Sequence, residues 1–230
     1  MRDDFMSMVS LNTLFLETQV RKLHLGKGNM ALFSPERLTA MIERDQRQIQ
    51  NMVRLIDDML DVTRMRSGAL SIQPKPMDLA ALTRNVGESF AHQAEAAGST
   101  TEAHAPRQLE GVWDEFRIEQ VLSNLLTDAL RYGGGGPVEI HLQEDEDDGG
   151  ERVARLCVRD HGMDIAPEDL ARIFEQFERT DDSRRRAAGL GLGLYITRQI
   201  VLAHEGRIGV DSAQGEGALF TVRLPLAPAT

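Results

Sequence analysis

A heptad pattern between residues 34 and 68 constrains the fold of this 230-residue chain more than any other feature. Ser34 is a good N-cap, Pro35 suits the first helical position, and Gly68 supplies a stop signal. Between them, the residues of one seam recur in alternating steps of four and three: Leu38, Ile42, Asp45, Ile49, Met52, Ile56, Met59 and Thr63. This repeat predicts a long helix that packs against other helices. The polar Asp45 on the seam more often fixes register or oligomeric state than performs chemistry.

A weaker companion pattern covers residues 3–25, where Asn12 and Gln19 occupy apolar positions of the repeat, and residues 26–29 break it. We therefore expect an antiparallel helical hairpin over residues 1–72. Its two apolar stripes cannot both be covered within one hairpin, so we expect two hairpins to form a four-helix-bundle dimer. The alternative is that the hairpin packs on its own C-terminal domain.

Helices and strands are mixed after a short, stiff, proline-containing linker at residues 73–78. Helices are expected over about 79–97, capped by Asp78, and over about 114–131, ending at four glycines. Strands are expected near 109–112, 138–142, 153–158, 207–211 and 218–224. The acidic run at 144–150 indicates a solvated hairpin tip, and its unorganised spacing argues against a metal site. With antiparallel neighbours, residues 79–230 predict an α+β fold, a two-layer α/β sandwich.

Charge and cysteine content exclude several classes of protein. The net charge of -10 argues against broad binding to nucleic acid or to anionic membranes. The single cysteine, Cys157, cannot form an internal disulfide, which fits a reducing cytosol. No window approaches the ~18 consecutive apolar residues of a membrane helix, so we expect a soluble cytoplasmic chain without membrane contact of its own, which is compatible with a core cut from a longer protein.

Two motifs between residues 160 and 196 predict a nucleotide pocket. The first is an acid at the end of an apolar strand, Asp160-His161-Gly162-Met163-Asp164-Ile165. The second is a glycine ladder that opens an apolar helix, Gly189-Leu190-Gly191-Leu192-Gly193-Leu194. Glycines let backbone N–H groups approach an anion, and a helix N-terminus adds a partial positive charge. The ladder alone is weak evidence, because glycine also marks ordinary turns and helix caps.

Several ordered blocks of residues follow the heptad hairpin and the linker: Asn124 to Tyr132, Asp160-x-Gly162, Phe174, Phe177, the glycine ladder and Gly215-Glu216-Gly217. With these blocks, the order of elements strongly resembles the cytoplasmic core of bacterial sensor histidine kinases. The resemblance covers essentially the whole chain. It implies a dimerisation and phosphotransfer hairpin, then an ATP-binding domain of the kind shared with gyrase, mismatch-repair and chaperone ATPases. The implied cofactors are ATP or ADP and Mg²⁺, and the implied partner is a response-regulator receiver domain.

The resemblance also implies a role for each motif residue. Asp160 would accept a hydrogen bond from the adenine amino group, and Asn124 and Asp128 would hold Mg²⁺. The other residues implied to contact the nucleotide are Arg131, Tyr132, Gly162, Asp164, Ile165, Arg179, Gly189, Leu190, Gly191, Leu192, Gly193 and Leu194. Of these, Arg179 would approach the terminal phosphate. Gly215 and Gly217 would close the far side of the pocket, and Phe174 and Phe177 would either anchor a lid or belong to the core.

The hairpin departs from the family pattern at its reactive residue. Family sequences continue an Asp-Phe-x-x-x-Val-Ser segment into a His-Glu pair, whereas here residues 4–10 run into Leu11-Asn12-Thr13. The phosphoacceptor histidine is absent, either because Leu11 replaces it or because residues around it are deleted. The other histidine of the hairpin, His24, is expected to be solvated rather than to serve as a substitute acceptor. Autophosphorylation of this chain is therefore not expected.

Three pocket positions also depart from the family pattern. Asp128 stands in place of a second asparagine, Asp164 in place of the second glycine of Asp-x-Gly-x-Gly, and Ala218 in place of a threonine or serine. The Asp128 carboxylate would repel a triphosphate in the absence of metal, and Asp164 would place a charged side chain where backbone normally approaches the base. Three hypotheses follow: a signalling core that binds ATP but acts through protein contacts, an active kinase domain that phosphorylates a partner's histidine in trans, or a hairpin that serves only as a dimeric scaffold for a receiver domain.

Overall fold

The computed structural model describes residues 35–66, 71–147, 149–178 and 191–226, which fall into two compact units, Met1–Leu60 and Asp61–Thr230. Helix α2 (Pro35–Arg66) begins at the proline and ends just before the predicted stop, which confirms this helix. The companion helix expected over 3–25, with Leu11 and His24, lies outside the described residues.

The predicted seam of α2 is visible on its surface. Ile42, Ile49 and Ile56 are each 50 to 59% exposed within the single chain. Exposed isoleucines at heptad spacing agree with the periodic pattern, and the dimer that they suggest stays a prediction. Among the described residues, no helix combines the length and apolarity needed to cross a membrane.

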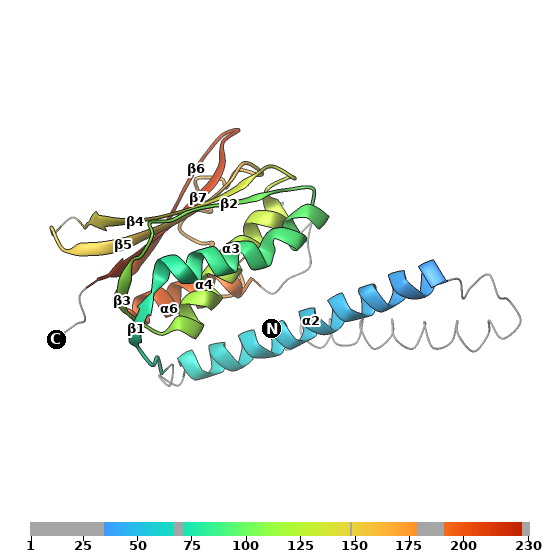
Figure 1. Cartoon of the computed structure of the whole chain (residues 1–230), viewed down its shortest axis with the longest axis horizontal. Helices are drawn as coiled ribbons and strands as arrows, with labels where there is room; N and C mark the ends of the chain where they lie inside the picture. Colours follow the sequence, from blue (N-terminus) through green and yellow to red (C-terminus); the bar gives the residue numbers. More distant parts are fainter. Residues whose placement is uncertain (1–34, 67–70, 148, 179–190, 227–230) are drawn as a thin grey trace, which may run out of the picture. The chain divides into compact units, whose positions relative to one another are not determined.

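In its described residues, the second unit contains two sheets and three further helices (Figure 1). The larger sheet has the strand order β2-β4-β5-β7-β6, and β1 pairs with β3 in a separate two-stranded sheet. The strands are β1 (Lys75–Asp78), β2 (Thr101–His104), β3 (Glu110–Trp113), β4 (Val138–Glu146), β5 (Arg152–Asp160), β6 (Arg207–Ala213) and β7 (Gly217–Pro225). The helices are α3 (Leu79–Ala96), α4 (Glu115–Tyr132) and α6 (Gly193–Ala203), and they cover one face of the larger sheet.

Local signals set the helix ends. The side chain of Asp78 accepts a hydrogen bond from the Ala80 amide at the start of α3, and Asp114 accepts one from the Arg117 amide at the start of α4. Each satisfies one of the amide groups left without a partner in a first helical turn. Gly98 follows α3 with a positive φ of 71°, as a glycine stop predicts.

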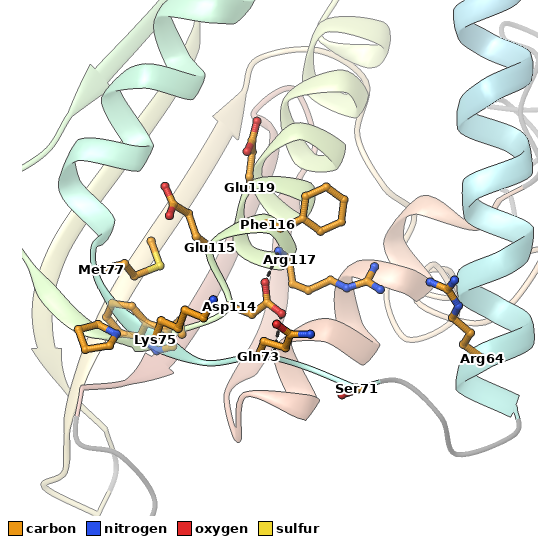
Figure 2. A pocket seen from close by; sticks show the side chains of 12 residues that line it. Arg64, Ser71, Gln73, Lys75, Met77, Asp114, Glu115, Phe116, Arg117 and Glu119 are labelled. Carbon is orange, nitrogen blue, oxygen red and sulfur yellow. Dashed lines mark hydrogen bonds between the residues drawn. The ribbon is translucent and has the colours of Figure 1, made fainter.

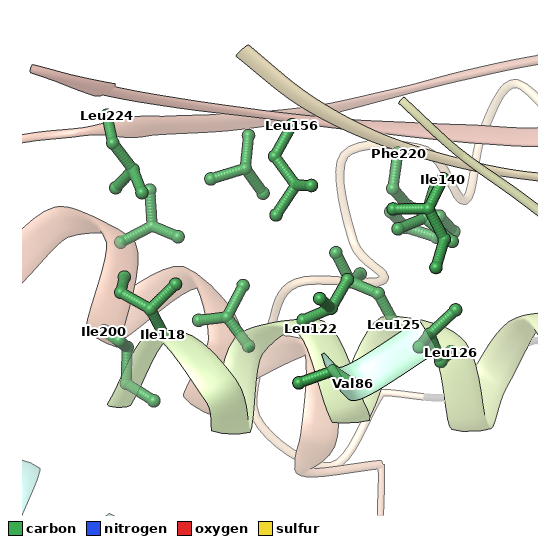
Figure 3. Packing of buried hydrophobic residues seen from close by; sticks show 14 of the residues in the cluster. Val86, Ile118, Leu122, Leu125, Leu126, Ile140, Leu156, Ile200, Phe220 and Leu224 are labelled. Atoms are coloured by element: carbon green, nitrogen blue, oxygen red, sulfur yellow. The ribbon is translucent and has the colours of Figure 1, made fainter. Parts of the chain in front are cut away.

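The hydrophobic core lies between the three helices and the larger sheet. Figure 3 shows leucines of α4, such as Leu122 and Leu125, directed toward Leu156 and Phe220 of the sheet. Leu122, Leu125 and Leu156 are fully buried. Burial of this apolar area is the main stabilising term, at roughly 25 cal/mol per Å² removed from water. The predicted α+β fold with two layers is therefore observed.

Three details of the sheet prediction were wrong. Strand β2 was not predicted, and it pairs parallel with β4, so the sheet is mixed rather than antiparallel. The linker contains β1, because prolines tolerate the extended edge of a two-stranded sheet. The acidic run is not all hairpin tip, since β4 extends to Glu146, where Arg155 of β5 pairs with Asp145 at 2.8 Å. Ion pairs with arginines of β5, Asp145 with Arg155 and Glu144 with Arg152, offset the acidic charge and favour continuation of the strand.

Candidate nucleotide site

Asp160 lies at the carboxyl end of the central strand β5 and is only 4% exposed. Its Oδ1 accepts a hydrogen bond from the Gly162 amide at 3.0 Å. Burial raises the pKa of the Asp160 carboxyl above its usual range, against the opposing effect of the Gly162 and Ala218 amides. A buried acid with a shifted pKa at a strand end is a candidate binding group.

Glycines pack the backbone tightly around Asp160. A Cβ atom on Gly162 would lie 2.1 Å from the Tyr132 carbonyl oxygen and 2.3 Å from Gly133 Cα. A Cβ on Gly217, which has a φ of 74°, would lie 2.3 Å from the Asp160 carbonyl oxygen. Only glycine fits at these two positions without displacing backbone, so the C-terminal end of α4 and the start of β7 both meet the loop after β5.

The carboxylate of Asp164 is bound to the turn between β6 and β7. Its Oδ2 accepts a hydrogen bond from the Gly215 amide at 2.7 Å, and its Oδ1 accepts one from the Gly217 amide at 3.1 Å. The neighbouring Ile165 amide donates to Ser212 Oγ at 2.9 Å. Ser212 was not predicted, because a serine inside a short strand carries no distinctive signal.

One face of α4 links the two ends of the candidate site. Asn124, Asp128 and Tyr132 follow one another at intervals of four residues, so they share a face of the helix, and all three are half-buried. Asn124 Nδ2 donates to the Gly193 carbonyl oxygen at 3.3 Å and lies 3.4 Å from Thr197 Oγ1 in α6. Arg131 Nη1 lies 4.0 Å from Asp128 Oδ1. The row therefore runs from α6 to the loop that follows Asp160.

The last part of the glycine ladder forms the start of α6. Gly191 has a φ of 68°, and its carbonyl oxygen accepts a hydrogen bond from the Phe177 amide at 3.1 Å. Leu192 is 2% exposed and anchors the helix start in the core, while Leu194 packs against that core from a half-buried position. No side chain of the described residues caps α6, and the first amide groups of a helix are a type of group that binds anions. Arg179, Gly189 and Leu190 lie outside the described residues.

The two phenylalanines between the motifs pack on the core. Phe174 is 7% exposed and contacts Phe220 edge-on, with ring centroids 6.3 Å apart. Phe177 is half-buried against the same core and has a positive φ of 66°. Phe174 thus belongs to the core, and Phe177 connects that core to Gly191.

Asn124 and Asp128 offer oxygen ligands of the type that Mg²⁺ prefers. No group of three or more His, Cys, Asp or Glu side chains in the described ranges could hold a metal ion. Mg²⁺ in nucleotide sites is commonly bound by one or two protein oxygens together with phosphates, and the residues present fit that mode.

A separate hollow of about 700 Å³ lies beside the N-terminal end of α4 (Figure 2). It contains none of the predicted nucleotide residues. The backbone N–H of Gln73 donates a hydrogen bond to Asp114 Oδ2 at 2.8 Å within it. Its charged side chains are of both signs: Arg64, Lys75, Arg117, Asp114, Glu115 and Glu119. Such a lining does not select an anion, so the candidate site is the region around Asp160 and α6.

Comparison with known proteins agrees with this geometry. A family model for histidine kinase-, DNA gyrase B-, and HSP90-like ATPases matches residues 113–228, which include α4, Asp160, the ladder and the β6–β7 turn. The chain belongs to this family. Within the family its relatives are sensor histidine kinases, so the second unit is an ATP-binding core of the sensor-histidine-kinase type.

Two sensor proteins illustrate this relationship. The signal transduction histidine-protein kinase BaeS of Escherichia coli (strain K12) is 31% identical over 229 residues, which cover 98% of this chain and 47% of that protein. Sensor protein SrrB of Staphylococcus aureus (strain MRSA252) is 35% identical over 173 residues, covering 75% of this chain and 29% of that protein. The chain thus spans less than half the length of these relatives.

Solved structures show the same fold. The Acinetobacter baumannii histidine kinase AdeS matches with a TM-score of 0.69 at 22% identity, over 95% of this chain and 96% of that one. Full-length ShkA in complex with AMPPNP matches with a TM-score of 0.68 at 27% identity, over 97% of this chain and 46% of that one.

Proposed function

We propose that the second unit binds ATP or ADP with Mg²⁺, the adenine at Asp160 and the phosphates at the start of α6. The observation that carries this proposal is the row of Asn124, Asp128 and Tyr132 on α4, one end of which contacts Gly193 while the other meets Gly162. The row connects a buried carboxylate to the N-terminus of α6, which no side chain of the described residues caps. A purine with a phosphate chain needs this combination of an acceptor and an anion site.

Each end of the proposed site has a distinct task. The Asp160 carboxylate accepts a hydrogen bond from the exocyclic amino group of adenine, and the absence of a side chain at Gly162 allows close approach of the base. The first amide groups of α6 and the ladder backbone donate to the phosphates, and Leu192, Gly193 and Leu194 set their position. Arg131 and Tyr132 flank the nucleotide, and Arg179 approaches the terminal phosphate.

Asn124 and Asp128 are the residues that would hold Mg²⁺. The bound ion would neutralise phosphate charge, which otherwise opposes binding beside the Asp128 carboxylate. The presence of AMPPNP in the related ShkA structure supports nucleotide binding by this fold.

The wider role is signalling without autophosphorylation. Residues 1–72 act as a dimerising hairpin, residues 73–78 as a linker and residues 79–230 as the ATP-binding domain, and the homodimer engages a response-regulator receiver domain. The sequence of the hairpin lacks the histidine at the acceptor position, where Leu11 follows the Asp4 to Ser10 segment. Without an imidazole at that position, no group receives the phosphoryl from ATP.

Two measurements on the full chain test this proposal. Titration calorimetry with ATP, ADP and AMPPNP, with and without Mg²⁺, is expected to show binding that Asp160→Asn weakens at least tenfold. Absence of binding at millimolar nucleotide would disprove the nucleotide site. Incubation with radiolabelled ATP and Mg²⁺ is expected to leave no acid-labile phosphate on the chain, and its appearance would disprove the loss of autokinase activity.

A second candidate is a kinase domain that phosphorylates a histidine in trans, and the retained geometry at Asp160 and Gly193 favours it. The chain would be mixed with a histidine-bearing hairpin from a related sensor kinase and labelled ATP. Label on that hairpin supports the trans activity. Unlabelled hairpin, together with measurable ATP binding, favours the signalling core that acts through protein contacts.

A further inference from the structure

Asp164 makes two bonds that the family's glycine could not make. Both carboxylate oxygens are engaged by the β6–β7 turn, Oδ2 by the Gly215 amide at 2.7 Å and Oδ1 by the Gly217 amide at 3.1 Å. Hydrogen bonds from amides to an ionised acceptor are stronger than neutral ones. The substitution therefore adds a link between two loops that are 51 residues apart in the sequence.

Ser212 reinforces the same link. Its Oγ donates to the Gly217 carbonyl oxygen at 2.6 Å and accepts from the Ile165 amide at 2.9 Å. Asp164 and Ile165 are thus each bonded to the β6–β7 hairpin, one directly to its turn and one through Ser212. Gly217 is held at both its amide and its carbonyl.

Gly217 in turn lies in close contact with the loop that carries the adenine acceptor. The position of a Cβ on Gly217 lies 2.3 Å from the Asp160 carbonyl oxygen and 2.8 Å from the Gly162 nitrogen. Gly217 therefore has no free space toward this loop. A movement of the turn would change the backbone contacts that hold Asp160 and Gly162 in place. The contacts form a continuous chain from the Asp164 carboxylate to the Asp160 loop.

We infer that Asp164 is a positioning residue for the adenine end of the nucleotide site, an inference that rests on the proposed function. Its carboxylate is directed to the β6–β7 turn, and it holds that turn against the Asp160–Gly162 backbone before nucleotide arrives. Such preorganisation improves affinity because less ordering is required on binding.

The substitution Asp164→Gly separates positioning from repulsion by the sign of its effect. If the carboxylate repelled nucleotide, restoring the glycine would tighten binding, and more for ATP than for adenosine, because the repulsion grows with phosphate charge. If Asp164 positions the loop, Asp164→Gly and Asp164→Ala weaken ATP and adenosine alike, by about tenfold for the loss of charged hydrogen bonds. Asp164→Asn keeps one carbonyl acceptor, so its affinities lie between those of wild type and Asp164→Ala.

Amide hydrogen exchange of the full chain without ligand gives a readout that is independent of nucleotide. Peptides that contain Gly215 and Gly217 are expected to exchange faster in Asp164→Ala and Asp164→Gly, while peptides from β4 and β5 keep their protection. The matched control is Glu168→Ala, which removes another exposed acid of the same connecting segment and is expected to change neither readout.

The outcomes are distinguishable. Tighter ATP binding by Asp164→Gly, or unchanged exchange at the turn in both variants, overturns the role of Asp164. If wild type binds neither ATP nor adenosine, the proposed function fails and the positioning role fails with it, while the exchange data still show whether the carboxylate holds the turn.

Discussion

The carboxylate of Asp61, near the C-terminal end of α2, lies 2.8 Å from the guanidinium of Arg117 in α4, and both side chains are at most 10% exposed. Gln120 Nε2 donates a further hydrogen bond to the same oxygen at 2.8 Å. Val62, the next residue along α2, is buried in the core of the second unit. The last residues of α2 therefore pack within the second unit, although the heptad pattern continues through them.

Asp61→Ala is expected to destabilise the second unit by about 3–5 kcal/mol, because it leaves the Arg117 charge buried without its partner. The free energy of unfolding in urea measures this loss. Asp57→Ala, at an exposed position of the same helix, is the control and is expected to change stability by less than about 0.5 kcal/mol. Combining Asp61→Ala with Arg117→Met should recover much of the loss. Equal effects of Asp61→Ala and Asp57→Ala would show that the ion pair has no such role.

Gly162→Ala is expected to destabilise the fold by about 1–3 kcal/mol and to reduce nucleotide binding, since its Cβ would lie 2.1 Å from a backbone oxygen. Gly209→Ala in β6 is the matched control, because its Cβ would meet nothing within 4 Å. Thermal unfolding of both variants, followed by ATP titration, checks the prediction. A Gly162→Ala protein as stable as Gly209→Ala would contradict the close approach of α4 to this loop.

ATP affinity is expected to fall as the pH is lowered. The fall should begin at a higher pH than it would if the adenine acceptor were an exposed aspartate. Burial raises the pKa of Asp160 above its ordinary value of 3.8, so the adenine acceptor loses its charge earlier as pH falls. Stability changes in the opposite direction. Because the folded state binds the proton of Asp160 more tightly than the unfolded state does, this group favours the folded state more as the pH is lowered. Calorimetry between about pH 4.5 and 7.5 measures the affinity.

Asp160→Asn provides the control for this titration. Its amide oxygen still accepts from the Gly162 amide, so the fold is expected to be retained, while adenine binding is weak at every pH. An ATP affinity of wild type that falls only with global unfolding would rule out titration of Asp160.

Stability in acid is expected to depend in part on Glu139, which accepts from His161 Nε2 at 3.0 Å and from His141 Nε2 at 3.2 Å. These bonds hold the pKa of Glu139 below its ordinary value of 4.5. A carboxyl with a lowered folded pKa stabilises the protein above its unfolded pKa, and the contribution disappears as pH falls through the folded pKa. Glu139→Gln should therefore cost up to about 1 kcal/mol near pH 6 and less near pH 3.

Urea unfolding of wild type and Glu139→Gln at the two pH values checks this prediction. The side chain of Glu139 is 31% exposed, so solvent screens the pair and the difference is small. A difference that is the same at both pH values would show that ionisation of Glu139 is not its source.

Much of the fold could be predicted because its signals are local. The helix from Pro35, the caps at Asp78 and Asp114, and the alternation of Val138, Ile140 and Leu142 each lie within a few residues of the structure that they specify. Strand β2 was missed because its four residues, Thr101–His104, include two exposed polar side chains and form a strand only through pairing with β4.

The candidate site likewise has a part that the sequence predicts and a part that it does not. The residue types and spacing around Asp160 and Gly193 suffice to predict a nucleotide motif, whereas the direction of the Asp164 carboxylate does not follow from them. As a charge in a glycine position, Asp164 suggests a charged side chain where backbone normally approaches the base. Its actual acceptor role depends on Gly215 and Gly217, which the fold brings to it.

The sequence by itself determined the helices, most strands and the family motifs, because periodicity and capping act over one or two turns of chain. Only the tertiary structure decided that Asn124 contacts Gly193, 69 residues away, and that Asp164 binds a turn 51 residues away. Contacts at such separations depend on how strands pair and helices pack, and no local pattern of residues encodes the direction in which a single side chain then points.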